Sequence, residues 1–417
     1  MSIFSSAFQN RNFRWIFGGG AVSLFGDQFT KIALPWLALT LNRDPSTLGL
    51  VLAAISLPRA LLVLPGGALV DRLSARAVLV YTKLLNGLLL GVLCLLASRD
   101  ALSVPVVLLL SLCIGVVSAF SAPAASAILP QSLPPELLAK AIRVMVTARE
   151  ASVLIGSIVA GTLIAVLEQL PGGSRQGLAV ALGFDAFSFL FSAWTMSRVT
   201  RVPKPASPPA TGMLTEIGVA LRQFWADPQL RWICLYSAAV ELLVAGPIDV
   251  ALPVIASEQL PHGAAALGLL IAAQGAGMLV GMAATGLRRS RWALSLGAGL
   301  LVGDVLIAVL LVPLGYSRAT WCAVGLLALV GVVRGYIQVS VFTWIQGRVA
   351  PALLGRTMGL IMFINLALTP VGLVVSGLAL RYMSPGALFA ASSVLVLVTA
   401  AGAAAGTPIR RVRAVHG

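Results

Sequence analysis

Charged residues are scarce in this sequence. Only 10% of its 417 residues are Asp, Glu, Lys or Arg, and 59% are hydrophobic, whereas about 25% of the residues in a soluble domain are charged. So little charge cannot cover a water-exposed surface, which excludes most soluble functions. We therefore expect lipid to cover part of the surface and the chain to be an integral membrane protein.

Histidine and cysteine are scarce as well. The two histidines, His262 and His416, lie far apart, and the four cysteines stand singly inside apolar runs, without metal-ligand spacing or a disulfide framework. This scarcity argues against a histidine-based metal site, a Ser-His catalytic pair and a membrane-embedded enzyme. The sequence also has no phosphate-binding loop, which argues against direct ATP drive. We expect no enzymatic activity, no metal and no cofactor.

Long apolar runs make up most of the chain. A helix needs about 20 apolar residues to cross a bilayer core, and Leu-, Ala- and Val-rich runs without alternation favour helices over barrel strands. Breaks at charged or Pro/Gly-rich positions define twelve such runs: 13–41, 46–70, 77–98, 102–130, 137–167, 177–197, 230–257, 264–287, 292–315, 319–347, 353–380 and 385–406. The predicted fold class is an all-α membrane protein with twelve transmembrane helices.

The basic residues are distributed unevenly between the segments that connect these spans. If the N-terminus lies inside, the inner segments hold most of the Lys and Arg residues. The outer loops hold only Arg43, Arg99, Arg175, Arg318 and Arg381. The positive-inside rule then places both termini in the cytoplasm. The net charge of +15 is thus a topology signal, and we expect no nucleic-acid partner.

A hydrophilic stretch separates the first six spans from the last six. Its prolines predict an extended linker, and four apolar residues at helical spacing within 213–225 predict a short amphipathic helix on the inner membrane surface, a solvated linker being the alternative. The predicted domains are a six-helix bundle over residues 1–197, a cytoplasmic linker over 198–228 and a second six-helix bundle over 229–417.

The two halves resemble each other in sequence. Leu133–Lys140 is similar to Val349–Arg356, which lies 216 positions later, and the tripeptide Ala-Leu-Pro at 33–35 recurs at 251–253. Offsets of 216 to 219 positions recur at four places and indicate two parallel copies of one unit. Two similar bundles around a central cavity can rock about a site near the membrane midplane, which is the architecture of a secondary transporter.

The segment after the second span carries a recognisable motif. Its sequence, Gly67-Ala-Leu-Val-Asp71-Arg72-Leu-Ser-Ala-Arg76, resembles the G-x-L-x-D-R-x-G-R-R/K signature of the major facilitator superfamily. The resemblance implies that Gly67, Asp71, Arg72 and Arg76 form a gate of charge contacts between the halves. An ordinary positive-inside loop is the alternative, and it does not explain the acidic residue.

Four further stretches resemble the exporter branch of this superfamily, which includes enterobactin and macrolide efflux proteins. They are Ser23–Asp27, Pro123–Lys140, Phe184–Phe189 and Glu216–Trp232. The resemblance implies that spans one, four, seven and ten line a central cavity.

Charged residues inside the predicted spans are candidates for function, because each costs about 2.5–3.5 kcal/mol on insertion scales. Asp27 is our first choice as a proton carrier, since a carboxylate in a low-dielectric cavity exchanges protons near neutral pH. A permanent ion pair with Lys31, on the same helix face, is the alternative. Glu241 is the second candidate, either for protons or for substrate recognition. Arg334 either binds an anionic substrate group or neutralises Glu241 or Asp27.

The remaining candidates are assigned to the substrate cavity. Lys31 and Asp249 precede the shared Ala-Leu-Pro by the same step, so we expect them to face each other across the outer cavity. The other members of this group are Arg59, Glu150, Arg334 and Gln338. Asp304 lies in span nine, which the resemblance makes peripheral, and we expect it to have a structural role.

Together these features predict a secondary active transporter of a bacterial inner membrane that exports a small organic or amphiphilic compound by proton antiport. A lipid or lysolipid flippase and a siderophore exporter are the alternatives within this class, and a passive channel is the alternative of another class. The expected partners are the substrate, protons and membrane lipids, and the expected oligomeric state is a monomer.

Overall fold

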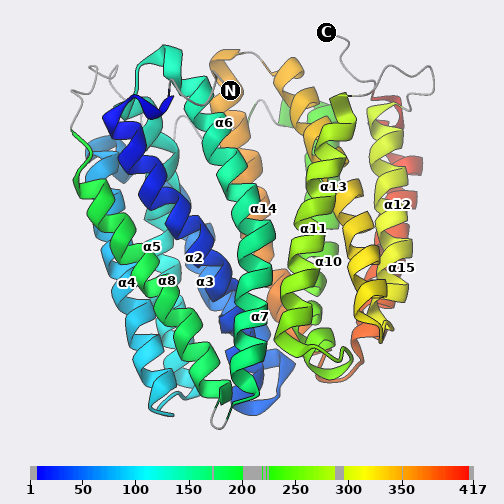
Figure 1. Ribbon diagram of the computed structural model, residues 1–417. Helices are drawn as coiled ribbons and strands as arrows, with labels where there is room; N and C mark the ends of the chain where they lie inside the picture. Colours follow the sequence, from blue (N-terminus) through cyan, green and yellow to red (C-terminus); the bar gives the residue numbers. More distant parts are fainter. Residues whose placement is uncertain are drawn as a thin grey trace. The chain divides into compact units, whose positions relative to one another are not determined.

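The computed structural model describes residues 7–170, 173–200, 218, 222, 225–286, 295–349 and 351–412. These residues form helices and no strands, which confirms the all-α class (Figure 1). The long helices are, in chain order, α2 (Arg11–Asn42), α3 (Pro45–Arg72), α4 (Ala75–Ser98), α5 (Val104–Ser132), α6 (Pro135–Ala151), α7 (Ser157–Glu168), α8 (Gly173–Ser197), α10 (Pro228–Glu258), α11 (Gly263–Gly286), α12 (Leu296–Gly315), α13 (Thr320–Arg348), α14 (Pro351–Ala379) and α15 (Pro385–Gly406).

The helices coincide with the twelve predicted spans, and each boundary agrees to within four residues. In the described ranges, eleven helices are long and apolar enough to cross a membrane. The helix of the first span, α2, is not among these eleven. It is long enough, with 32 residues, but it carries Asp27, Gln28 and Lys31 near its middle, which lower its hydropathy. The predicted linker and its amphipathic helix over 213–225 fall largely outside the described residues.

The fifth span is not a uniform α-helix. Between α6 and α7 the chain forms a π-helical turn, η1 (Ser152–Gly156), whose Gly156 packs against Gln28 and Phe25 of α2. A π turn in a helix is rare and frequently marks a functional site. This turn allows α2 and the fifth span to approach closely just after Glu150.

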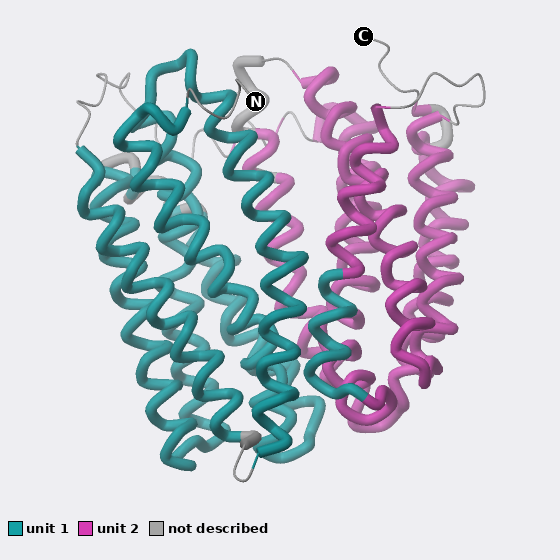
Figure 2. Tube along the Cα trace, in the orientation of Figure 1, with its two compact units in different colours: residues 1–208, 262–272 teal, residues 209–261, 273–417 magenta. Residues whose placement is uncertain are grey.

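Contacts along the chain define two compact units. Unit 1 comprises residues 1–208 and 262–272, and unit 2 comprises residues 209–261 and 273–417 (Figure 2). In unit 1, α8 packs against α4 and α2, and α3 packs against α5. In unit 2, α12 packs against α15 and α13, and α10 packs against α14. The pairs α4–α8 and α12–α15 occupy equivalent positions in the two sequence repeats, which supports the duplication.

Glycines bring α13 unusually close to the part of α11 that belongs to unit 2. A Cβ atom on Gly331 would meet the backbone carbonyl of Gln274, and one on Gly335 would meet that of Met278. The spacing of four residues is the small-xxx-small pattern of close membrane helix pairs. This contact fixes the rotation of α13 and so the direction in which Arg334 points.

The first helix of each repeat begins with a matching cap. The side chain of Asn10 accepts hydrogen bonds from the backbone of Asn12 and Phe13, and that of Asp227, 217 positions later, accepts from Gln229 and Leu230. Both residue types are favoured N-caps because their side chains satisfy free N–H groups of the first turn. The two repeats therefore share the same hydrogen-bonded cap at the start of their first helix, in agreement with the sequence duplication.

Each capped helix start is also joined to the end of the fourth helix of its own repeat. In unit 1, Asn12 Nδ2 donates to the Ser132 carbonyl at 3.4 Å. In unit 2, Arg348 bridges to Asp227 through two contacts, Nε to Oδ2 at 2.5 Å and Nη2 to Oδ1 at 3.1 Å. Ser132 and Arg348 are 216 positions apart, so the two joints are equivalent but use different chemistry.

The stabilisation by the Asp227–Arg348 ion pair should decrease at acidic pH. Burial alone would raise the pKa of Asp227, but hydrogen bonds from Arg348, Leu230 and Gln229 outweigh it and hold this pKa below its usual range. A lowered pKa stabilises the fold above the unfolded-state value of about 4, and this contribution is lost as the pH falls through the folded-state value.

We expect the Asp227→Asn variant to keep the helix cap but lose this acid response. At neutral pH the variant should be less stable by about 0.5–1 kcal/mol, as for a partly exposed ion pair, and the difference should shrink as the pH falls below the unfolded-state value of about 4. Thermal unfolding of the purified protein at several pH values measures both. An unchanged difference at all pH values would contradict the assignment.

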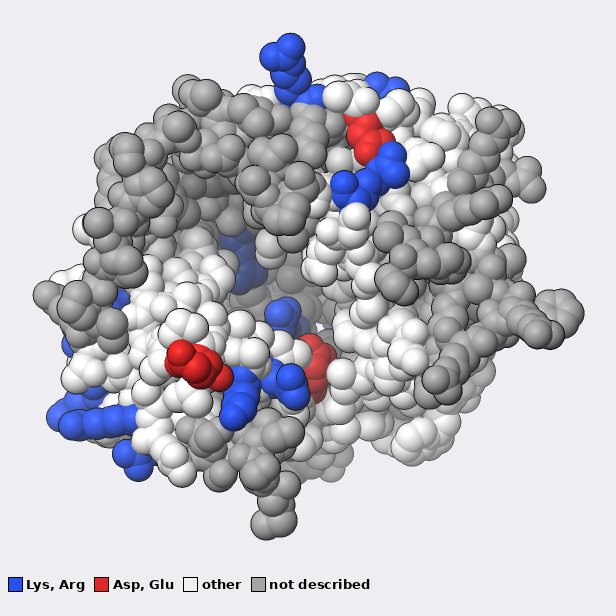
Figure 3. Space-filling view, turned by 90° about the horizontal axis from the view of Figure 1, so that it is seen from above, with Lys and Arg blue, Asp and Glu red and all other residues white. Residues whose placement is uncertain are grey.

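Basic side chains are conspicuous at the end of the molecule where α2 begins. Figure 3 shows this face, on which Lys and Arg residues are more prominent than Asp and Glu. The pattern agrees with the predicted cytoplasmic side, and the orientation itself stays a prediction.

Candidate functional site

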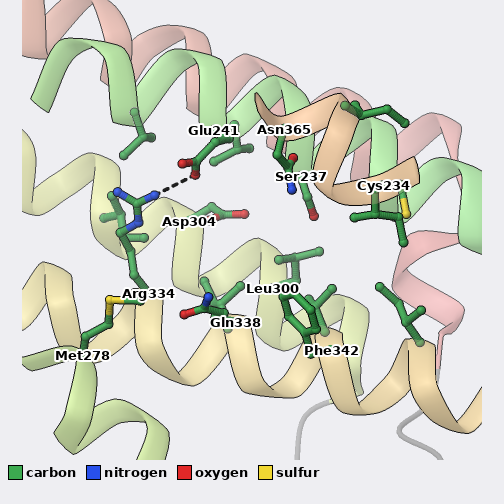
Figure 4. Close-up of a pocket in the computed structure, with 18 residues that line it drawn as sticks. Cys234, Ser237, Glu241, Met278, Leu300, Asp304, Arg334, Gln338, Phe342 and Asn365 are labelled. Carbon is green, nitrogen blue, oxygen red and sulfur yellow. Dashed lines mark hydrogen bonds and ion pairs between the residues drawn. The ribbon is translucent and has the colours of Figure 1, made fainter. Parts of the chain in front are cut away.

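Unit 2 contains a cavity of about 370 Å³ between α10, α11, α12, α13 and α14 (Figure 4). Half of its lining residues are aliphatic, and the others are polar, aromatic or sulfur-containing. The polar lining residues are Ser237, Glu241, Asp304, Arg334, Gln338 and Asn365. An apolar cavity with a few converging polar groups is the usual form of a site for a small organic molecule.

An ion pair crosses this cavity from α13 to α10. Arg334 Nη2 lies 2.6 Å from Glu241 Oε2, and the two side chains retain 23% and 39% of their exposure. Of the roles considered for Arg334, the structure thus places it against Glu241. Gln338 lies one turn further along α13 and lines the same wall.

Asp304 of α12 also belongs to the cavity wall. It is 4% exposed, and its Oδ2 atom has no hydrogen-bond partner among the described residues. Arg334 acts on Asp304 and on Asp249 electrostatically, beyond its direct contact with Glu241. The expectation of a peripheral position for Asp304 therefore differs from the structure, because α12 packs against α13 and reaches the cavity.

Unit 1 contains a second group of charged residues, around Asp27. Asp27 is half-buried and makes no hydrogen bond or salt bridge to the residues that the structure describes. Its carboxylate acts at longer range on Arg59 of α3, on Lys83 of α4 and on Asp185 of α8. Asp27 therefore lies in a mixed field of two cations and one further acid.

Two members of this group are held by hydroxyl groups. Asp185, which is 1% exposed, accepts hydrogen bonds from Thr30 Oγ1 at 2.5 Å and Ser188 Oγ at 2.9 Å. Lys83 Nζ donates to Ser23 Oγ at 2.6 Å and lies 4.4 Å from the centre of the Phe189 ring. These bonds join α2, α4 and α8 through polar contacts inside unit 1.

Lys83 is a charged residue of this group that is not among the sites predicted from the sequence. It is the only charged residue within the predicted span 77–98, and the rule that a charge inside a span needs a role would have identified it.

The other predicted cavity residues are more dispersed. Lys31 is exposed and donates to Gln28 Oε1 at 3.4 Å. Arg59 and Asp249 are exposed, and Glu150 is half-buried two residues before the π turn. The proposed approach of Lys31 to Asp249 joins residues of different units and stays a prediction.

The predicted gate is only partly described. The side chains of Asp71 and Arg72 and the surroundings of Gly67 lie outside what the structure describes. Arg76 Nε donates to the Met196 carbonyl at 3.2 Å, and its Nη2 donates to Ser197, so this guanidinium joins the start of α4 to the end of α8 within unit 1. Its role in gating stays a prediction.

Membrane-length helices in two sequence repeats, with a cavity inside one of them in which a few polar groups converge, are typical of polytopic transporters. Comparison with known families agrees: residues 16–373 match the model of the Major Facilitator Superfamily. The chain belongs to this family and is a transporter rather than an enzyme, which confirms the resemblance found in the sequence.

The relatives are distant. The multidrug efflux pump Tap of Mycolicibacterium fortuitum is 26% identical over 367 residues, which cover 84% of this chain and 85% of Tap. A bacterial homologue of the human lysosomal transporter Spinster, in an inward-facing and occupied conformation, superposes with a TM-score of 0.72 at 15% identity, over 93% of this chain and 94% of the other. The nucleoside transporter NupG gives 0.70 at 13% identity, over 94% and 98%. Both solved structures show the same fold.

Proposed function

We propose that this transporter exports a small organic or amphiphilic compound across a bacterial inner membrane in exchange for protons, by alternating access and as a monomer with both termini in the cytoplasm. The observation that carries the proposal is the unit 2 cavity, whose aliphatic residues and partly exposed ion pair suit an organic compound. The similarity to a protein named as a multidrug efflux pump supports export.

The contacts favour Asp27 over Glu241 as the proton carrier. Glu241 is held by Arg334 at 2.6 Å and has to lose this partner before it takes up a proton. Asp27 makes no such bond within the described part of the chain, while Arg59 and Lys83 act on it from a distance.

Transport by the purified protein in proteoliposomes tests the proposal. Candidate compounds, including phospholipids, lysolipids and siderophores, are first ranked by the thermal stabilisation they give. We expect the best of them to accumulate uphill when a pH gradient is imposed and to lose this accumulation when a protonophore is added. Equal fluxes with and without the gradient would exclude proton coupling, and flux that never saturates would indicate a channel.

A further inference from the structure

The unit 2 cavity has an excess of negative charge. Its charged lining residues are two acids, Glu241 and Asp304, and one base, Arg334. The guanidinium bonds directly to Glu241, and no cation of the described residues lies within salt-bridge distance of Asp304. A buried carboxylate without a counterion is unfavourable, so a cation entering the cavity would compensate it.

Unused hydrogen-bond acceptors lie in the same wall. Asp304 Oδ2 and Ser237 Oγ are buried, and neither has a hydrogen-bond partner among the residues described. The hydroxyl of Tyr236 lies beside Asp304 and interacts with it, but this hydroxyl does not line the cavity and carries no positive charge. Buried polar atoms in folded proteins are nearly always bonded, and an ammonium group offers three donors and no acceptor.

The arrangement disfavours an anionic ligand. The only cation in the cavity lining, Arg334, is occupied by Glu241, as Figure 4 shows. An anion would have to displace this carboxylate and would then lie next to Asp304. The aliphatic part of the wall, which includes Ile337, Val341 and Ile364, suits the apolar body of a ligand.

We infer that the unit 2 cavity recognises an organic cation, an amine with an apolar body, and that Asp304 is the residue that bonds its ammonium group. The inference deepens the proposed function, since it names the class of compound for the same cavity. It assigns a binding role to a residue that sequence analysis expected to be structural.

Three probes with one ring system test the inference: 1-naphthylmethylammonium, 1-naphthalenemethanol and 1-naphthoate. Binding to the full-length protein in lipid nanodiscs is measured by fluorescence, with empty nanodiscs to correct for partition into lipid. We expect the ammonium to bind about tenfold more tightly than the alcohol, because a charge-assisted hydrogen bond is about twice as strong as a neutral one. The carboxylate should bind most weakly.

The Asp304→Asn variant should remove this preference. Its affinity for the ammonium should fall about tenfold, and its affinity for the alcohol should change less than twofold. Asp100→Asn is the matched control, because it removes the same charge from an exposed pair with Arg175 in which both side chains are 60% exposed. If Asp304→Asn fails to fold, Asp304→Glu replaces it and should retain the preference at lower affinity for both probes.

The inference is overturned if the wild-type protein binds none of the probes, if it prefers the alcohol or the carboxylate, or if the preference survives in Asp304→Asn or is lost in Asp304→Glu. These outcomes concern binding selectivity alone. Failure of the proposed function would appear instead as the absence of gradient-driven flux for every compound, so the two failures are distinguishable.

Discussion

Replacing Asp27 by Asn is expected to abolish uphill transport driven by a pH gradient. The amide has the size of the carboxyl group but cannot exchange a proton, so the gradient would no longer be coupled to substrate movement. Accumulation in proteoliposomes should fall to the level of protein-free vesicles. Downhill exchange of substrate should persist, because the unit 2 cavity is built from other residues.

Two comparisons make this result specific. Asp100→Asn, which neutralises an exposed acid, should transport uphill like the wild type. Glu241→Gln tests the second candidate, and we expect it to retain coupling, since its acid is engaged by Arg334. Uphill transport by Asp27→Asn at the wild-type rate would refute the role of Asp27.

Replacing Arg334 by Gln should lower the stability of the fold far more than replacing Glu241 by Gln. Without the guanidinium, Glu241 and Asp304 are left as two acids in one wall, whereas Glu241→Gln retains Arg334, which acts on Asp304 electrostatically without contacting it. Removing one partner of a fully buried pair costs about 3–5 kcal/mol. We expect about 2 kcal/mol for Arg334→Gln, because the side chains are 23% and 39% exposed and water screens them.

A double-mutant cycle measures this asymmetry. The Glu241→Gln/Arg334→Gln variant should be more stable than Arg334→Gln alone, since the second substitution removes one of the two uncompensated acids. Thermal unfolding in detergent measures the stability of the two single variants and of the double variant. Additive losses of stability would show that Glu241 and Arg334 do not stabilise each other. A smaller loss of stability in Arg334→Gln than in Glu241→Gln would contradict the expected repulsion between Glu241 and Asp304.

The boundaries of the helices could be predicted because local residues set them. Proline occupies the first turn at Pro228 and Pro385, and acidic or hydroxyl side chains cap the same helices. The π turn could not be predicted, since Ser152–Gly156 lies in a run that suits an α-helix equally well. Its stability depends on contacts with α2 that are distant in sequence.

The candidate site could be predicted only in part. The cost of burying charge identified Glu241 and Arg334, but their pairing depends on the rotation of α13, which its glycines fix against α11. Asp304 was placed by family resemblance at the periphery, and no property of one sequence shows that its helix reaches the cavity. The pairing of Glu241 with Arg334 and the position of Asp304 both depend on contacts between helices that are distant in sequence.

The π turn has a consequence for the symmetry of the two repeats. The matched segments contain the same number of residues, since Leu133 and Gly156 correspond to Val349 and Gly372. The first copy nevertheless unwinds locally at η1, whereas α14 continues as an α-helix through the equivalent stretch. Side chains beyond the turn therefore differ in angular phase from their counterparts in α14. Two segments of equal length thus present different side chains to neighbouring helices because their helical winding differs, without any insertion or deletion.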